Sequence, residues 1–306
     1  MAKGSKNKSI LCAGHLVYDI RDYVEQMPQL DKTTFMYMPP QVGAGGSAAN
    51  VALNCIKLGH QASLISNVGD DRHGKFLLDE LKKRGLDTDQ IKIIKGGRTA
   101  LSVILIDKSG QVMVIEDKGC VEDKRDFDEK KIAQSSWVHL TGTSQQWLEK
   151  ISKIAYKNGI IISFDPGRAA SRLGIEKLSK ILERTEYLIV NRKELEALTG
   201  SASEESAKEL SKEFNLFTIV KNGSKPVFVC TTINKIFYVE PFRVPYVVDT
   251  LGAGDAFAAG LICGKIEGMS FYEAIKFAHA AAAAKVMHPG AQGMPERKIV
   301  LKQFKF

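Results

Sequence analysis

The stretch from residue 248 to residue 260 reads VDTLGAGDAFAAG, and it decides the fold. Small residues fill its centre, and an alanine-rich run that favours a helix follows them. The pattern predicts a strand that ends in a tight loop, and a long helix that starts there. The backbone N–H groups of Gly252, Ala253 and Gly254 can approach an anion closely because almost no side chain covers them. The helix N-terminus adds partial positive charge, so we predict an anion-binding loop.

Asp255 directly follows this loop. A carboxylate is repelled by a bound phosphate, so it needs a task of its own, such as accepting a proton from a substrate hydroxyl. Asp is also a common helix-capping residue, and the residues alone leave both roles open. The motifs G-x-x-x-x-G-K-S/T and G-x-G-x-x-G are unmatched, since Phe257 stands where the second needs its third glycine. A P-loop or dinucleotide-binding fold is therefore disfavoured.

Outside this stretch, short apolar runs alternate with amphipathic helical patterns. The expected strands are 10–13, 63–68, 137–140, 160–164, 187–190 and 217–220, and the expected helices are 48–58, 75–83, 146–157, 175–183, 193–198 and 204–214. Such alternation predicts an α/β fold with a mainly parallel sheet that helices cover on both faces.

Two segments break the alternation. The side chains of 34–42 alternate in polarity, and 99–106 with 111–116 form a predicted hairpin that turns at 108–110. They predict a small antiparallel layer beside the main sheet, with strands from about 33–43 and 97–117. We find no linker rich in Gly, Ser or Pro, so we expect one domain over 1–306 with this layer as a lid.

The composition is that of a globular protein, with 44% hydrophobic and 25% charged residues and a net charge of +8. The positive charge is scattered rather than interleaved with aromatics, so we expect no nucleic-acid partner. The longest apolar stretches, 256–263 and 278–284, are shorter than the roughly 20 residues that span a bilayer, so we expect no membrane partner. Five widely separated cysteines indicate reduced thiols and a cytoplasmic protein.

Two signatures resemble the ribokinase-like (PfkB) family of carbohydrate and nucleoside kinases. They are DTLGAGD at 249–255 and GGSAANVA at 45–52, the latter followed by LG at 58–59 and VGDD at 68–71. The similarity runs in the family's order from about Ile10 to Gly293. It implies a three-layer αβα sandwich with a small β lid. It also implies a sugar kinase that uses ATP and Mg²⁺, with activation by a monovalent cation common among relatives.

The resemblance implies roles for matching residues around the anion-binding loop. Asp255 would be the general base, and Gly252, Ala253 and Gly254 would stabilise the γ-phosphate during transfer. A loose phosphoryl-transfer transition state needs exactly such alignment and distributed positive charge more than it needs a strong base. Asp249 would touch substrate hydroxyls or anchor the loop.

The resemblance also implies a metal and a nucleotide site. Asn191 and Glu194 match an Asn-x-x-Glu element that helps to hold Mg²⁺, usually through water, although a capping Asn and a surface Glu would give the same pattern. The segment 221–226 replaces the usual T-x-G-x-x-G; Gly223 still allows close backbone approach, and Lys221 adds charge towards the phosphates. His288 falls in the loop that flanks the adenine pocket in relatives.

The acceptor pocket is implied at the strand ends and the lid. Its matching residues are Asp19, expected at the end of the first strand, and Gly45, Gly46 and Asn50 in the glycine-rich turn. Asp19 is alternatively a turn residue. Arg168 follows an altered family turn at 165–167, and the sequence leaves open whether it faces a phosphorylated substrate, the nucleotide or solvent.

Alternatives to a sugar kinase of the ribokinase or fructokinase kind remain at this stage. A nucleoside kinase would need an apolar or stacking wall for its base, which the side chains of 35–38 in the lid would provide. A sugar or nucleotide sensor on the same scaffold would not need Asp255 beside the phosphate. Because the lid has an apolar face and little chain to cover it, we expect a homodimer joined through the lids.

Overall fold

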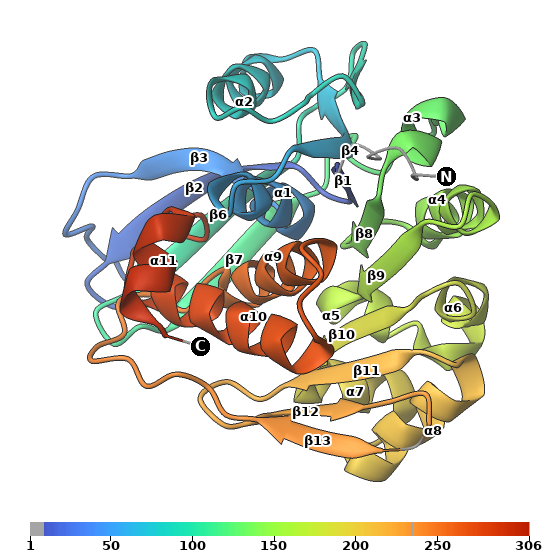
Figure 1. The fold of residues 1–306 in the computed structure, drawn as a ribbon. Helices are drawn as coiled ribbons and strands as arrows, with labels where there is room; N and C mark the ends of the chain where they lie inside the picture. Colours follow the sequence, from blue (N-terminus) through green and yellow to red (C-terminus); the bar gives the residue numbers. More distant parts are fainter. Residues whose placement is uncertain (1–8, 234, 306) are drawn as a thin grey trace.

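The main sheet of the computed structural model, which describes residues 9–233 and 235–305, has the strand order β13-β12-β11-β10-β9-β8-β1-β4-β5 (Figure 1). Its strands are β1 (Ile10–Ala13), β4 (Ala62–Gly69), β5 (Ile91–Ile94), β8 (Trp137–Thr141), β9 (Ile161–Asp165), β10 (Tyr187–Asn191), β11 (Phe217–Lys221), β12 (Val227–Cys230) and β13 (Ile236–Val239). The pairs from β11 to β5 are parallel, and the β11–β12 and β12–β13 pairs are antiparallel. The mainly parallel sheet is therefore confirmed.

Helices cover both faces of this sheet, as the alternating pattern predicts. One face carries α1 (Ser47–Lys57), α2 (Arg72–Lys83), α9 (Ala253–Ile266), α10 (Phe271–Val286) and α11 (Arg297–Gln303). The other carries α3 (Glu129–Gln134), α4 (Gln145–Lys157), α5 (Gly167–Ser171), α6 (Gly174–Leu182), α7 (Arg192–Thr199) and α8 (Glu204–Phe214). Among the helices of the described residues, none has the length and apolar character that a membrane crossing requires.

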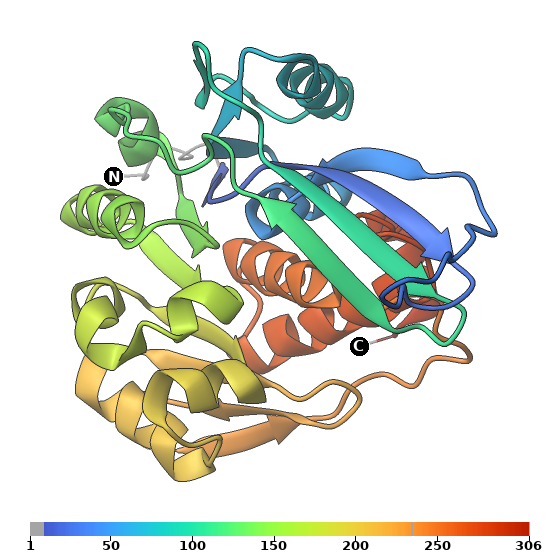
Figure 2. The ribbon, with the colours of Figure 1, turned by 180° about the vertical axis from the view of Figure 1, so that it is seen from behind.

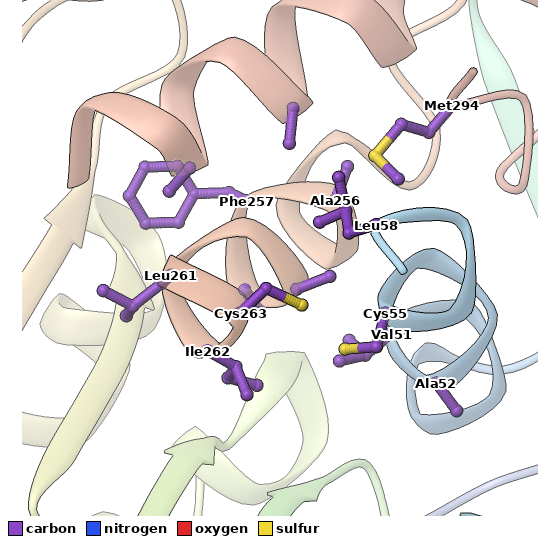
Figure 3. Close-up of a cluster of buried hydrophobic side chains, with 14 of the residues drawn as sticks. Val51, Ala52, Cys55, Leu58, Ala256, Phe257, Leu261, Ile262, Cys263 and Met294 are labelled. Atoms are coloured by element: carbon purple, nitrogen blue, oxygen red, sulfur yellow. The ribbon is translucent and has the colours of Figure 1, made fainter. Parts of the chain in front are cut away.

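Helix α9 is packed between α1 and α10, and this packing fixes where its N-terminus lies. Figure 3 shows Val51 and Cys55 of α1 together with Ile262 and Cys263 of α9 in one buried cluster. Gly260 faces α10 so closely that an added Cβ would lie 2.7 Å from the Cα of Ala278. Real Cβ atoms do not approach another carbon this closely, so any side chain at 260 would push the two helices apart.

A second sheet of four strands forms the lid, with the order β3-β2-β6-β7 (Figure 2). Its strands are β2 (Val17–Val24), β3 (Gln41–Gly45), β6 (Leu101–Asp107) and β7 (Val112–Asp117). The predicted hairpin is confirmed as the antiparallel pair β6–β7. The expectation of a wholly antiparallel layer is wrong, because β2 and β6 pair in parallel. Strand β2 was not predicted, and the expectation that Asp19 ends the first strand is wrong because Asp19 lies inside β2.

Two further expectations are wrong in detail. The strand expected over 34–42 starts only at Gln41. Pro39 and Pro40 precede it and lack the N–H groups that the hydrogen bonds of a sheet need. Before these prolines, Met36 forms an isolated bridge with Val24. The strand expected before the anion-binding loop is absent from the described chain. The N–H groups of Val248 and Asp249 donate instead to the carbonyl of Val286 at the end of α10.

Candidate active site

The site lies along the carboxyl ends of the parallel strands. Asp165, Asn191 and Lys221 are the last residues of β9, β10 and β11, and therefore reach the same edge of the sheet. Strand β1 lies between β4, which the chain forms next in this sheet, and β8, which it forms on the other side of β1 after β5 and the lid hairpin. Open α/β sheets bind ligands at such a switch point, and only three residues separate the end of β1 from the lid strand β2.

Asp255 sits in the first turn of α9, which gives its carboxylate a fixed direction. Its Oδ2 accepts a hydrogen bond of 2.8 Å from the Nδ2 of Asn50, which the structure therefore brings to the expected base. Burial raises the pKa of Asp255 to about 6, although the hydrogen bond from Asn50 favours the ionised form. A carboxyl with this pKa is ionised at pH 7 and yet can accept a proton in a transition state.

The anion-binding loop has the strained turn that only glycine tolerates. Gly252 has φ of +78°, and an added Cβ would overlap the carbonyl of Ala291. The N–H of Ala253 donates to the carbonyl of Thr250 at 3.2 Å. The N–H groups of Gly252, Gly254 and Asp255 meet no acceptor in the described chain and lie at the N-terminus of α9. An anion at this position would therefore find free donors and the positive end of a helix.

Asp249 holds this loop in place. Its Oδ1 accepts the N–H of Leu251 at 2.8 Å, and its Oδ2 accepts the N–H of Gly290 at 2.7 Å. Lys285, which is fully buried, donates to the carbonyl of Asp249 at 2.7 Å, and burial lowers the pKa of this lysine to about 8. Of the two roles considered for Asp249, the contacts present are those of an anchor. Lys285 was not predicted as a site residue; α10 places it here.

On the far side of the loop, Lys221 forms an ion pair of 2.7 Å with Asp165. Burial alone would lower the pKa of Lys221, but Asp165 and then Glu194 outweigh it, and the pKa is raised. A Cβ added to Gly254 would lie 3.3 Å from the Lys221 Nζ. The ammonium group therefore lies directly over the anion-binding loop, where the sequence placed it.

A cavity of about 480 Å³ opens beside the loop, between Gly223, Ala253 and helix α10. Apolar side chains and His279 line most of it, including Phe242, Val247 and Ala283. Burial lowers the pKa of His279 to about 4, so the neutral ring N–H donates to the carbonyl of Val239. His288 is not among the residues that line this cavity, whereas Gly223 is.

Asn191 and Glu194 form a reciprocal capping box at the start of α7. The Oδ1 of Asn191 accepts the N–H of Glu194 at 2.9 Å, and the Oε2 of Glu194 accepts the N–H of Asn191 at 2.8 Å. Burial, and then the charge of Asp165, raise the pKa of Glu194. These crowded oxygen atoms suit a hard cation that keeps several of its waters. Within the described residues, no group of three or more His, Cys, Asp or Glu side chains could hold a metal directly.

Asp19 lies on β2 beside the glycine-rich turn. Its side chain occupies the space over Gly45, where an added Cβ would overlap the carboxylate. Gly46 has φ of +90° and precedes α1, so it aims Asn50 at Asp255. Burial raises the pKa of Asp19 to about 7. Arg168 is exposed on α5, where its carbonyl accepts a hydrogen bond from the Ser171 hydroxyl at 3.4 Å. Its guanidinium group makes no hydrogen bond or ion pair with the described residues.

Gln292, which the sequence did not indicate, joins the lid to the base. Its Nε2 donates to the Oδ1 of Asn50 at 3.0 Å and to the carbonyl of Ala44 in β3 at 2.7 Å. Arg84 contacts its side-chain oxygen, and Lys57 donates to its carbonyl at 2.7 Å. The contacts of Gln292 span more than 200 residues of sequence, so no local pattern reveals them.

Comparisons with known proteins agree with this geometry. The family model described as pfkB family carbohydrate kinase matches residues 7–298. An ATP-dependent ribose-1-phosphate kinase of Halopiger xanaduensis is 34% identical over 94% of this chain and 94% of that protein. A ribokinase of Haemophilus influenzae is 31% identical over 92% of this chain and 94% of its own length.

Among solved structures, Arabidopsis thaliana ribokinase complexed with ribose and ATP superposes with a TM-score of 0.85 at 27% identity. The match covers 98% of this chain and 99% of that one. With the fold, the anion-binding loop and both sequence signatures in agreement, this chain belongs to the pfkB family of carbohydrate kinases, phosphotransferases with an alcohol group as acceptor.

Proposed function

We propose that this protein transfers the γ-phosphate of ATP to a hydroxyl of a sugar, in the manner of ribokinase. The observation that carries the proposal is the position of Asp255. Its carboxylate lies at the N-terminus of α9, next to N–H groups that meet no acceptor in the described chain and across the loop from Lys221. A base and an anion site so close together are what hydroxyl activation and phosphoryl transfer require.

In the reaction, Asp255 accepts the proton of the sugar hydroxyl as its oxygen attacks the γ-phosphorus. The bond between that phosphorus and the leaving ADP oxygen breaks at the same stage. The N–H groups of Gly252 and Gly254, together with the Lys221 ammonium, stabilise the charge on the transferred group. Asn50 orients Asp255, while Asp19 accepts hydrogen bonds from other hydroxyls of the sugar.

The nucleotide would occupy the 480 Å³ cavity beside the loop, with its base against the apolar side chains of α10. Asn191 and Glu194 would hold Mg²⁺ through water, and the ion would supply positive charge to the triphosphate. The side-chain oxygen atoms of Asn191 and Glu194, which come together at the start of α7 with the charge of Asp165 acting on Glu194, support a cation there. A monovalent cation remains a prediction to be tested by adding KCl or NaCl to the assay.

A nucleoside kinase is the second candidate, and one feature favours it. A cavity of about 260 Å³ beside Asp249 is lined by Tyr23, Ile106 and Val112 of the lid. A nucleobase could pack against such a wall. The expected wall at 35–38 is less suited, since all four of these side chains are exposed, with Phe35 at 67%.

The deciding experiment is an ADP-release screen with ATP, Mg²⁺ and a panel of sugars and nucleosides. Turnover with a sugar that is at least tenfold faster than with every nucleoside supports the first candidate. The reverse order supports the second. Tight binding of sugars without ADP release from any of them would instead identify a sensor and contradict the kinase proposal.

We further propose that the chain works as one unit over 1–306, in the cytoplasm and as a homodimer joined through the lids. The five cysteines, all buried free thiols, support a reducing compartment.

All of β7 is exposed, including four consecutive apolar residues at 112–115, which supports an apolar contact between lids. Sedimentation at micromolar concentration should give twice the mass of 33.7 kDa, and Val114→Glu should return the monomer. A wild-type monomer would contradict the dimer.

A further inference from the structure

Arg21 belongs to the acceptor side of the site, although no sequence motif draws attention to it. It lies two residues after Asp19 on β2, and side chains two apart on a strand point to the same face. Tyr23, the next residue on that face, lines the cavity beside Asp249. Asp19, Arg21 and Tyr23 therefore all face the space between the lid and the loops of the core.

Two glycines make room for the guanidinium group of Arg21. A Cβ added to Gly290 would overlap its Nη1, and a Cβ added to Gly43 would lie 3.1 Å from its Nη2. Gly43 comes from the lid strand β3 and Gly290 from the loop that Asp249 holds. The guanidinium is thus enclosed by backbone from both sides, which restricts its motion without using its N–H groups.

These N–H groups have no protein partner. The Nε of Arg21 is buried without a hydrogen bond, and no ion pair or hydrogen bond joins the guanidinium to another described residue. Arg21 interacts electrostatically with three titratable groups, Asp19, Tyr23 and Lys285, and the charges of Glu116 and Asp249 act on these same groups. Asp249 is already engaged with backbone N–H groups, and Asp19, whose pKa burial raises to about 7, forms no ion pair or hydrogen bond with Arg21. The arginine is therefore a cation without a direct ion-pair partner among the described residues.

A buried donor without a partner is unfavourable, so this arrangement calls for a ligand that supplies acceptors. The planar fork of arginine matches phosphate, which it binds through two parallel hydrogen bonds. A sugar hydroxyl offers a single weaker acceptor and leaves the positive charge uncompensated. Phosphate is thus the chemical group that fits the cradle best.

We propose that the acceptor of this kinase is a sugar that already carries a phosphate, and that Arg21 binds this phosphate. The inference rests on the sugar-kinase function proposed above. In the reaction, a free hydroxyl of the sugar phosphate loses its proton to Asp255 and forms a bond to the γ-phosphorus of ATP. The products are ADP and a sugar bisphosphate. The relative named ATP-dependent ribose-1-phosphate kinase has, by its name, an acceptor of this class.

Lys221 and Arg21 serve two different anions. Lys221 lies over Gly254 at the anion-binding loop, whereas Arg21 lies against Gly290 at the lid. Asp249 links these two places: its Oδ1 accepts the N–H of Leu251 in the anion-binding loop, and its Oδ2 accepts the N–H of Gly290. A phosphorylated acceptor would otherwise be repelled by the triphosphate, so a separate cation at its far end is a requirement of this substrate class.

The test compares D-ribose 1-phosphate with D-ribose as acceptors in an ADP-release assay. The variants are Arg21→Gln and, as a matched control, Arg98→Gln, since Arg98 is 78% exposed and pairs with Asp117 outside the site. We expect the wild type to prefer ribose 1-phosphate by at least 100-fold in kcat/KM. Arg21→Gln should lower kcat/KM for ribose 1-phosphate about 100-fold, mainly through KM. The decrease in kcat/KM for ribose should be at least tenfold smaller. Arg98→Gln should stay within twofold of the wild type.

A wild type that prefers ribose, or an Arg21→Gln variant that loses activity equally with both acceptors, would overturn the role of Arg21. If neither acceptor releases ADP, the sugar-kinase proposal fails for these sugars, and the Arg21 proposal is then decided by calorimetry. Binding of ribose 1-phosphate to the wild type that weakens at least tenfold in Arg21→Gln would support it. Equal affinity of the two proteins, or no binding to either, would overturn it.

Discussion

The core side and the lid side of the active site differ in how their charged groups are satisfied. On the core side, Asp255 accepts a hydrogen bond from Asn50, and Lys221 is paired with Asp165. These groups stand on a helix start and on strand ends. On the lid side, Arg21 has no partner in the described chain, and Asp19 is buried with its pKa raised to about 7. These groups stand in the middle of a strand whose sheet is partly exposed.

We infer from this difference that the core side and the lid side of the active site have different roles. The groups proposed to carry out phosphoryl transfer are held in place by the protein itself, which is the preorganisation that electrostatic catalysis requires. The groups proposed to recognise the acceptor keep unfilled hydrogen-bonding capacity, which a bound ligand would complete. Changes on the core side should therefore reduce turnover, and changes on the lid side should alter acceptor choice, pH response and stability.

The largest effect should come from Asp255→Asn. Asparagine keeps the shape but cannot take the hydroxyl proton, so we expect kcat to fall by ~10²–10⁴, about 3–5 kcal/mol, with nucleotide affinity unchanged. Steady-state kinetics and titration with ADP measure the two quantities. Asp79→Asn, an exposed position on α2, is the control and should behave as wild type. Turnover of Asp255→Asn within threefold of wild type would remove the base from this residue.

The pH profile of kcat/KM should report on the core side and on the lid side of the active site together. Burial raises the pKa of Asp255 to about 6 and that of Asp19 to about 7, and each carboxyl acts in its ionised form. As the pH falls through these values both become protonated, so kcat/KM should decrease roughly tenfold per pH unit between pH 7 and pH 6, and approach roughly 100-fold per unit below pH 6. In Asp19→Asn the decrease should begin only near pH 6. A profile that stays flat down to pH 5 would contradict both assignments.

Asn50→Ala should have a smaller effect on the core side. The hydrogen bond from Asn50 lowers the pKa of Asp255, so its loss should raise that pKa and misalign the base. We expect kcat to fall about tenfold at pH 7 and less at pH 8.5, because higher pH restores the ionised form. Asn54→Ala, one turn farther along α1, removes a buried amide without a partner in the described chain and serves as the control. An unchanged pH profile in Asn50→Ala would show that Asn50 does not act on the base.

The smallest effect concerns stability on the lid side. Because the pKa of Asp19 is raised on folding, its contribution to stability is full below about pH 4 and is lost as the pH rises through about 7. Asp19→Asn removes this loss, so at pH 8 its Tm should exceed that of the wild type by about 3–8 °C, with no gain at pH 4.5. Thermal unfolding by circular dichroism measures both. A gain of the same size at both pH values would show that packing, not charge, is responsible.

The core was predictable because its signals are local. Short apolar runs separated by amphipathic segments gave β8 to β11 with boundaries within one residue of the structure, and the turn at 108–110 gave the lid hairpin. Strand β2 was missed because Asp19, Arg21 and Asp22 interrupt its apolar pattern. The charges of Asp19 and Arg21 are tolerated because their face of the lid lines the site rather than a hydrophobic core; the structure does not explain Asp22, which lies on the opposite face.

The candidate site divides in the same way. The anion-binding loop and Asp255 are contiguous in sequence, and the family resemblance implied that Asn50 lines the acceptor pocket, whereas its hydrogen bond to Asp255 is a finding of the structure. Gln292, Lys285 and Arg21 reach the site only through folding, since their partners lie elsewhere in the chain. Arg21 did have one readable sign, its spacing of two from Asp19, but that sign becomes visible only once the segment is known to be a strand.

The tight contact of α9 with α10 at Gly260 has a practical consequence for engineering. Helix α9 carries the anion-binding loop at its tip, so a methyl group at 260, which has no room beside Ala278, would shift the tip relative to Lys221. A random-mutagenesis screen for variants that have lost kinase activity would thus recover substitutions at Gly260 as readily as substitutions of residues that contact ATP. Directed-evolution libraries aimed at new acceptors should leave this helix pair intact and place their diversity in the lid.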